Sequence, residues 1–117
     1  MKVKTIERKN GKLVSPTQPL NPILQISFRN EQNLITNFGY GEYCEKGDKI
    51  SKTTKTFYLL VCRRDIYQRE NPNKVNIGKL HVNNRPVTCF SIEPCGKTFV
   101  VLECRFDDIK ELTKAAS

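Results

Sequence analysis

Residues 74–106 hold the pattern that most limits the fold, because three runs of strand-forming residues follow one another across two short turns. The Asn83-Asn84 pair predicts a two-residue hairpin turn, since asparagine tolerates the left-handed backbone region that such turns need. Cys95-Gly96 predicts the next turn in the same way. We therefore expect a three-stranded antiparallel meander, to which the rest of the chain is added.

Pairing across these two turns assigns each side chain to a face of the sheet. Val82 is expected to face Arg85, and Cys89 to face Leu102. Apolar residues then occupy both faces, with Leu80, Val87, Cys89, Leu102 and Cys104 on one and Ile77, Phe90, Ile92, Phe99 and Val101 on the other. A sheet that is apolar on both faces must be covered on both sides or must curl.

The segments before the meander add further strands. Residues 23–30 alternate between apolar and polar, with residues 34–38 as a hairpin partner, and residues 53–64 form a strand that is apolar on both faces. Residues 1–14 contain an Asn-Gly turn and predict an edge hairpin or an arm, and the prolines of residues 15–22 predict a stiff connector. Residues 107–115 begin with two aspartates and predict one short helix.

One domain is expected over residues 1–117, because the chain is long enough for a modest core. The fold class is all-β, or a β-rich α+β fold with the short C-terminal helix. A small curled antiparallel barrel or a two-layer sandwich satisfies the two apolar faces. An OB-like fold is one form that such a barrel can take.

The cysteine pattern favours a reducing compartment. There are five cysteines at scattered spacing, and no apolar segment follows the charged N-terminus as a signal peptide would require. We expect a cytoplasmic protein with free thiols. Cys89 and Cys104 are expected to be diagonal neighbours, too far apart for a disulfide, and Cys95 to be exposed at a turn tip.

Neither a cofactor nor a metal is expected. The cysteines and the single histidine, His81, match no familiar zinc spacing, and no C-x-x-C pair occurs. A lone histidine in a strand is more often structural than catalytic, and the sequence shows no nucleophile elbow. The chain is therefore predicted not to be an enzyme, with no catalytic residue assigned.

The charge balance gives the main indication of function. Twenty basic residues against 12 acidic ones leave a net charge of +8, which favours a polyanionic partner or merely keeps the domain soluble. Residues 39–51 are expected to form a glycine-rich loop, whose tyrosines either stack on bases or pack back onto the sheet. Residues 65–70 form a polar loop or one helical turn. The longest apolar run, residues 57–62, is too short to span a bilayer, so no membrane partner is expected.

These features predict a small basic protein that binds nucleic acid, with single-stranded DNA or RNA favoured. The expected contacts are aromatic and basic side chains: Phe38, Tyr40, Tyr43, Lys46, Lys49, Lys52, Arg63, Arg64, Tyr67, Arg69, Lys74, Lys79 and Arg85. The alternative is a protein-interaction module, such as an accessory or inhibitor protein of the phage or plasmid type. Such a module would dock on a larger partner, or form a homodimer through a strand edge.

Overall fold

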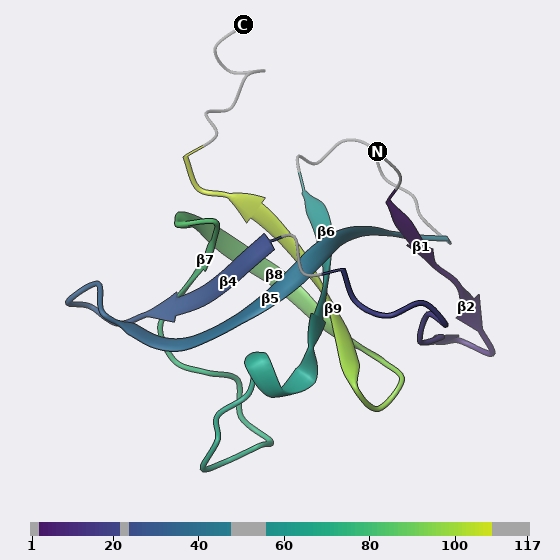
Figure 1. Cartoon of the computed structure of the whole chain (residues 1–117), viewed down its shortest axis with the longest axis horizontal. Coiled ribbons are helices and arrows are strands. Elements are labelled where there is room, and N and C mark those ends of the chain that lie inside the picture. The colour runs from purple at the N-terminus through teal and green to yellow at the C-terminus, as the bar shows by residue number, and fades with distance from the viewer. Residues whose placement is uncertain (1–2, 22–23, 48–55, 109–117) are drawn as a thin grey trace, which may run out of the picture.

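A computed structural model describes residues 3–21, 24–47 and 56–108, and its strands wrap into a closed antiparallel barrel (Figure 1). Six strands follow one another around the barrel in the order β7, β4, β5, β6, β9, β8, and β8 returns to β7. They are β4 (Leu24–Arg29), β5 (Ile35–Lys46), β6 (Phe57–Cys62), β7 (Lys79–Val82), β8 (Arg85–Cys95) and β9 (Phe99–Phe106). The predicted all-β, curled architecture is confirmed, with one strand more than an OB-fold has.

Three hairpin turns follow from asparagine and glycine. Asn10 and Gly11 both have positive φ, 53° and 78°, as do Asn83 and Asn84, at 51° and 68°. These values match the two-residue turns predicted at both places, and Val82 faces Arg85 as expected. The turn between β4 and β5 contains Asn30, whose side-chain oxygen accepts hydrogen bonds from two backbone amides of the turn.

The barrel interior is one apolar core. It contains Leu24, Ile26, Phe28, Leu59, Val61, Ile66, Leu80, Val82, Val87, Val100, Leu102 and Cys104, each almost fully buried. Glycines on the inner side of β5 let the walls approach one another. A Cβ at Gly41 would lie 2.6 Å from Val61 Cγ1 and 2.9 Å from the Leu60 carbonyl oxygen.

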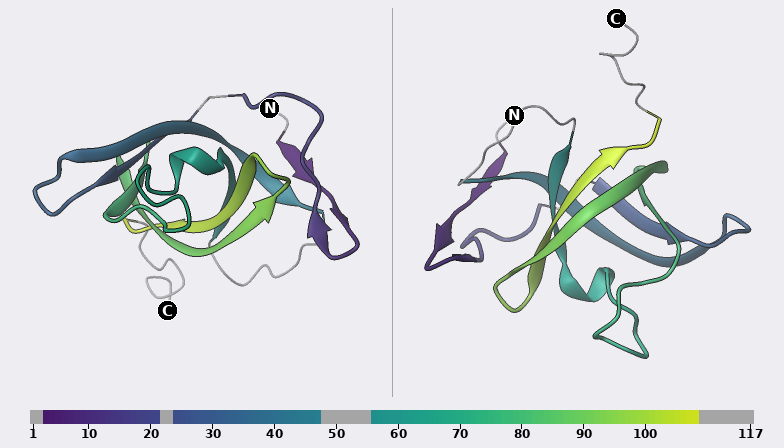
Figure 2. Two further views of the ribbon diagram at one scale, coloured as in Figure 1. Left: turned by 90° about the horizontal axis from the view of Figure 1, so that it is seen from below. Right: turned by 180° about the vertical axis from the view of Figure 1, so that it is seen from behind.

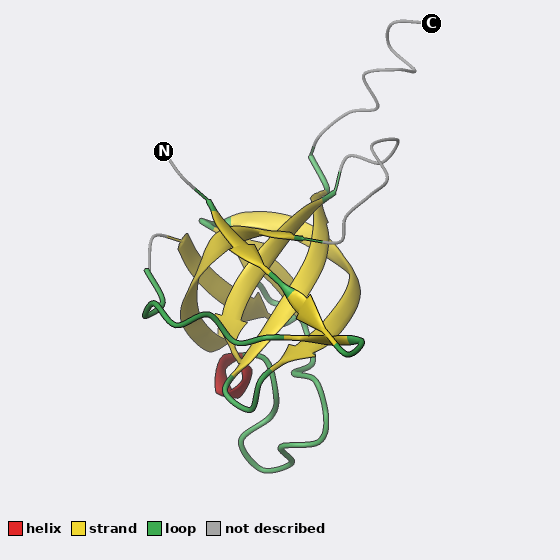
Figure 3. Cartoon of the chain, turned by 90° about the vertical axis from the view of Figure 1, so that its right-hand side faces the viewer, coloured by secondary structure: helices red, strands yellow, loops and turns green. Residues whose placement is uncertain are grey.

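The N-terminal segment covers the outside of the barrel (Figure 3). It contains β1 (Lys4–Ile6), which pairs in parallel with the end of β5, and the hairpin of β2 (Arg8–Lys9) and β3 (Lys12–Leu13), in which β3 bridges to β8. Under it lies a second buried cluster, made of Ile6, Leu13, Cys44, Leu60, Cys95 and Val101. Of the two ways expected to bury a sheet that is apolar on both faces, the structure uses both, because the sheet curls into a barrel and the N-terminal segment covers part of its outer face.

The predicted register of β8 against β9 is wrong. Cys95 pairs with Phe99, so the turn comprises residues 96–98, and a β-bulge follows Cys89. The bulge turns Phe90 outward, where it is 52% exposed, and returns Ile92 to the inner core. Cys95 is not an exposed thiol at a turn tip, because its side chain is buried beneath the N-terminal hairpin.

The prediction of a loop over residues 39–51 is also wrong for residues 39–46, which form part of a strand. β5 continues to Lys46, so Tyr40 and Tyr43 lie in a strand. The glycines of this segment suggested a loop, but Gly39 and Gly41 are buried at places where the strand packs closely against its neighbours. Lys49, Lys52 and residues 109–115 of the predicted C-terminal helix lie outside the described residues, and Asp107 and Asp108 form a turn.

A single 3-10 turn, η1 (Arg63–Asp65), follows β6 and lies across one opening of the barrel (Figure 2). Of the two alternatives for residues 65–70, the structure shows the polar loop, because the 3-10 turn ends at Asp65 and residues 66–70 are not helical. Ile66, directly after it, is 1% exposed and belongs to the barrel core. Within the segments that the structure describes, no helix has the length and apolar character to cross a membrane.

Candidate functional site

Two hydrogen bonds fix η1 against the barrel wall. Asn37 Nδ2 donates a hydrogen bond to the Asp65 carbonyl oxygen at 2.7 Å, and the Arg63 amide donates to the Thr98 carbonyl at 2.8 Å. Burial raises the pKa of Asp65 above its usual value, although Arg64 and the backbone of Tyr40 act in the opposite direction. The side chains of η1 therefore extend from a backbone that is held in place against the barrel.

A groove of about 950 Å³ surrounds η1, and we call it the basic groove. Its charged lining comprises Arg63, Arg64, Arg69, Lys97 and Asp65. Four cations thus meet one carboxylate among the described residues that line it. None of the ion pairs found in residues 3–21, 24–47 and 56–108 involves these four cations. The groove has a strong excess of positive charge, which attracts anions.

Arg63 is held in place by the ring of Tyr67. The guanidinium carbon lies 4.3 Å from the ring centroid, within the range of a cation–π contact. The Tyr67 amide also donates a hydrogen bond to the Arg63 carbonyl oxygen at 3.2 Å. A stacked guanidinium keeps its N–H groups at its edge, where they can meet the oxygens of a phosphate in a paired geometry.

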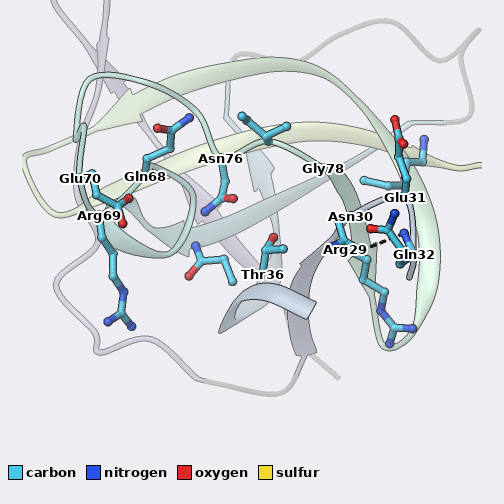
Figure 4. Close-up of a pocket in the computed structure, with 13 residues that line it drawn as sticks. Arg29, Asn30, Glu31, Gln32, Thr36, Gln68, Arg69, Glu70, Asn76 and Gly78 are labelled. Carbon is cyan, nitrogen blue, oxygen red and sulfur yellow. Dashed lines mark hydrogen bonds between the residues drawn. The ribbon is translucent and has the colours of Figure 1, made fainter. Parts of the chain in front are cut away.

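A second groove adjoins the first and lies beside the turn between β4 and β5 (Figure 4), and we call it the hairpin groove. It measures about 850 Å³ and shares Asn37, Gln68 and Arg69 with the basic groove. Arg69 and Glu70 lie on one side of it, and Arg29 and Glu31 lie on the other (Figure 4). Because acids accompany its cations, this groove has a mixed charge.

Two exposed rings stand on the outer side of β5, the strand whose Asn37 lines the basic groove. Phe38 and Tyr40 are 42% and 45% exposed, and their rings meet edge to face with centroids 5.2 Å apart. Asn37, the residue before them, lines the basic groove. The two rings project from the face of β5 opposite to Asn37, and neither lines the basic groove. The structure thus brings the strand that carries these two predicted rings, and not the rings themselves, to the predicted arginines.

The other predicted cations have acidic or aromatic neighbours elsewhere. Lys46 pairs with Glu93 at 2.8 Å, Lys79 with Asp107 at 2.6 Å and Arg85 with Asp108 at 2.8 Å. Lys46 also lies over the ring of Tyr58, and Arg85 lies over that of Phe106. These three cations are therefore less available to an anionic ligand.

Two further predicted residues are separated in space. Tyr43 contacts Phe57 at the start of β6, which is the end of that strand away from η1. Lys74 is exposed in the loop that follows Tyr67, where its carbonyl oxygen accepts a hydrogen bond from the Gln68 amide. Lys97 was not predicted, although it lines the basic groove. Its turn reaches η1 through the bond between Arg63 and Thr98, which no local sequence pattern reveals.

The histidine and cysteines have structural neighbours. His81 is almost buried, and its Nδ1 lies 3.0 Å from the Lys79 carbonyl oxygen. All five cysteines are free thiols, and three of them are buried. Across the described part of the chain, no group of three His, Cys, Asp or Glu side chains is arranged to hold a metal ion.

Comparisons with known proteins identified no relative of this chain. A scan against protein-family models, a search of curated proteins and a search of solved structures each returned no match.

Proposed function

We propose that this protein binds single-stranded nucleic acid in the basic groove and on the Phe38–Tyr40 pair of the adjoining strand β5. The observation that supports this most directly is the gathering of Arg63, Arg64, Arg69 and Lys97 around a single described carboxylate. Phosphates along a strand would lie against these cations. Bases of the same strand would stack on the exposed rings, since every base presents a flat π-face.

The exposed rings favour a single strand over a duplex. Bases in a duplex are already stacked on one another, so their faces are closed to a protein ring, whereas those of a single strand are open. Phosphate contacts also make binding sensitive to salt. Four contacts would give a slope of about −3 for the logarithm of the binding constant against the logarithm of salt concentration.

A binding titration tests the proposal. Labelled single-stranded DNA, single-stranded RNA and duplex would be titrated with the full chain at about 50 and 200 mM salt. We expect the single strands to bind more tightly than the duplex and to weaken steeply at higher salt. An absence of binding at low salt would overturn the proposal.

A pair of double variants then locates the site. Arg64→Glu with Arg69→Glu is expected to abolish most of the binding. The matched control is Lys9→Glu with Lys12→Glu, which changes the net charge equally on the exposed β2–β3 hairpin. Figure 1 shows that hairpin at the right of the barrel and residues 67–78 below the barrel, apart from it. Equal losses in both would show that only the overall charge matters.

A second candidate is a protein-interaction module, favoured by exposed apolar side chains near the hairpin groove. Leu34, Ile35 and Ile77 are 62%, 52% and 77% exposed. Such side chains gain by burial against a partner or a second copy of the chain. Sedimentation at increasing protein concentration tests self-association directly. A dimer that is insensitive to salt and is disrupted by Ile77→Ser would support this candidate. A protein that stays monomeric at every concentration would rule out the homodimer.

A further inference from the structure

Two cysteines lie directly opposite each other in the barrel wall. Cys89 of β8 pairs with Cys104 of β9 in the antiparallel ladder, and not diagonally as the sequence suggested. Residues that face each other in such a ladder have Cα atoms about 4.5 to 5.5 Å apart. That separation falls inside the range that disulfides span. The Cys89 thiol donates a hydrogen bond to the Ser91 carbonyl oxygen at 3.3 Å.

Cys89 is the member of this pair that a small solute can reach. It lines a cavity of about 220 Å³, together with Leu80, Ile92 and Leu102. The ladder between β7 and β8 is limited to two pairs next to the Asn83-Asn84 turn, so β8 leaves β7 before it reaches Cys89. Cys104 is fully buried behind its partner.

We propose that Cys89 and Cys104 are a redox pair that forms a reversible cross-strand disulfide when a hydroperoxide enters this cavity. Cys89 is the attacking thiol and Cys104 is the resolving thiol. This inference is independent of nucleic-acid binding. It assigns a chemical role to two residues that the sequence pattern indicated were too far apart for a disulfide.

The reaction balances with the peroxide as the oxidant. The Cys89 sulfur attacks one peroxide oxygen, the O–O bond breaks, and the departing oxygen leaves as water after taking a proton. The Cys104 sulfur then attacks the sulfenic acid on Cys89 and forms the S–S bond. The hydroxyl group leaves as water with the proton of Cys104. Two thiols are thereby oxidised and one hydrogen peroxide is reduced to two waters.

The electrostatics of the pair match these two roles. The neighbouring Cys104 side chain lowers the pKa of the Cys89 thiol, and this effect outweighs burial. The Cys89 side chain, followed by burial, raises the pKa of Cys104. The thiolate, which is the reactive form, therefore develops on the cysteine that faces the cavity.

The other cysteines are less suited to this chemistry. Cys44 and Cys95 are buried beneath the N-terminal segment, and burial raises the pKa of Cys44 to about 12. Cys62 is partly exposed but faces Phe99 across the ladder, not a second thiol. Burial raises its pKa as well. A disulfide is thus expected between Cys89 and Cys104 specifically.

The test exposes the folded full chain to hydrogen peroxide and then titrates its thiols in denaturant. We expect the titre to fall from five to three and to recover with dithiothreitol. Digestion with trypsin and chymotrypsin locates the bond, because cleavage after Phe90 and after Lys97 separates Cys89, Cys95 and Cys104. A bond between any other two cysteines, or no bond, would overturn the proposal.

Two variants complete the experiment. Cys89→Ser is expected to leave the remaining four thiols reduced, whereas Cys62→Ser should form the same disulfide as the wild type. Loss of two thiols in Cys89→Ser would contradict the assigned pair. If Cys89→Ser fails to fold, the peptide map of the wild-type chain decides alone, since it requires no substitution.

Discussion

The side chain of Asn37 in β5 donates a hydrogen bond to the carbonyl oxygen of Asp65 in η1, and this bond joins the strand of the exposed rings to the 3-10 turn of the arginines. Because the bond fixes the strand against the 3-10 turn, the rings and the cations keep a fixed relation. A ligand that spans both surfaces would therefore meet a preorganised site.

The ring pair leads to the first prediction. Phe38→Ala and Tyr40→Ala should each weaken the binding of single-stranded DNA by about 1 to 3 kcal/mol, because each removes a stacking surface. Fluorescence anisotropy measures the loss, with a thermal melt to verify the fold. Tyr43→Ala is the matched control, since that ring lies against Phe57, away from η1. Rings that can be removed without effect would place the bases elsewhere.

Gly41 gives a prediction about stability. A Cβ there would press on the side chain of Val61 and on the backbone of Leu60, neither of which can move freely inside the barrel. Gly41→Ala should lower the free energy of unfolding by about 1 to 3 kcal/mol, as overpacking does in other cores. Urea denaturation followed by circular dichroism measures the change.

The control for this prediction is Gly47→Ala. The Cβ at that position meets the end of the flexible Glu7 side chain, which can swing away. We therefore expect little change in Gly47→Ala. Equal effects in the two variants would show that close packing of the barrel walls is not the reason for Gly41.

The sequence predicted those features of the fold that depend only on residues close together in the chain. The Asn10-Gly11 and Asn83-Asn84 turns follow from the backbone freedom of those residues alone. The sequence also predicted apolar residues on both faces of the sheet. Leu102 lies in the barrel core, and the next residue along the strand, Val101, lies in the outer cluster beneath the N-terminal segment. The bulge after Cys89 did not, since a two-residue period cannot reveal where one extra residue is inserted.

The same limit applies to the candidate site. Arg63, Arg64 and Arg69 were predicted because they are close together in the chain. Lys97 was missed because only the folded β8–β9 turn brings it to η1. The acids that neutralise Lys46, Lys79 and Arg85 likewise lie far from these cations along the chain, so a count of local charge overstates the available cations.

Leu13 provides a test of whether the N-terminal hairpin is part of the fold. Its side chain is buried in the outer cluster, whereas its neighbour Val14 is 44% exposed. Leu13→Ala should cost about 2 to 5 kcal/mol of stability, as a buried leucine does in a closely packed core. Val14→Ala should change little. If Leu13→Ala unfolds at the same urea concentration as the wild type, the hairpin does not contribute to the cooperative unit.

Glu93 gives the last prediction, which concerns pH. Its carboxylate accepts hydrogen bonds from Arg8 of β2 at 2.6 Å and from Lys46 of β5 at 2.8 Å. The Arg8 guanidinium, aided by Lys46, holds the pKa of Glu93 at about 2, below its usual 4.5. An acid with a lowered pKa in the folded state stabilises the fold above its unfolded pKa, and this contribution is lost as pH falls. The loss from Glu93 should thus occur between about pH 4.5 and 2.

The carboxylate is partly exposed, so solvent screening limits the contribution to about 1 kcal/mol. Glu93→Gln should therefore be less stable than the wild type at pH 7, and this difference should shrink as pH falls from 4.5 to 2. Urea denaturation across this range measures both. Glu45→Gln, on the exposed side of β5, is the matched control. A difference between Glu93→Gln and the wild type that stays constant with pH would show that the ion pairs do not stabilise the fold, because only an ionised partner depends on pH in this way.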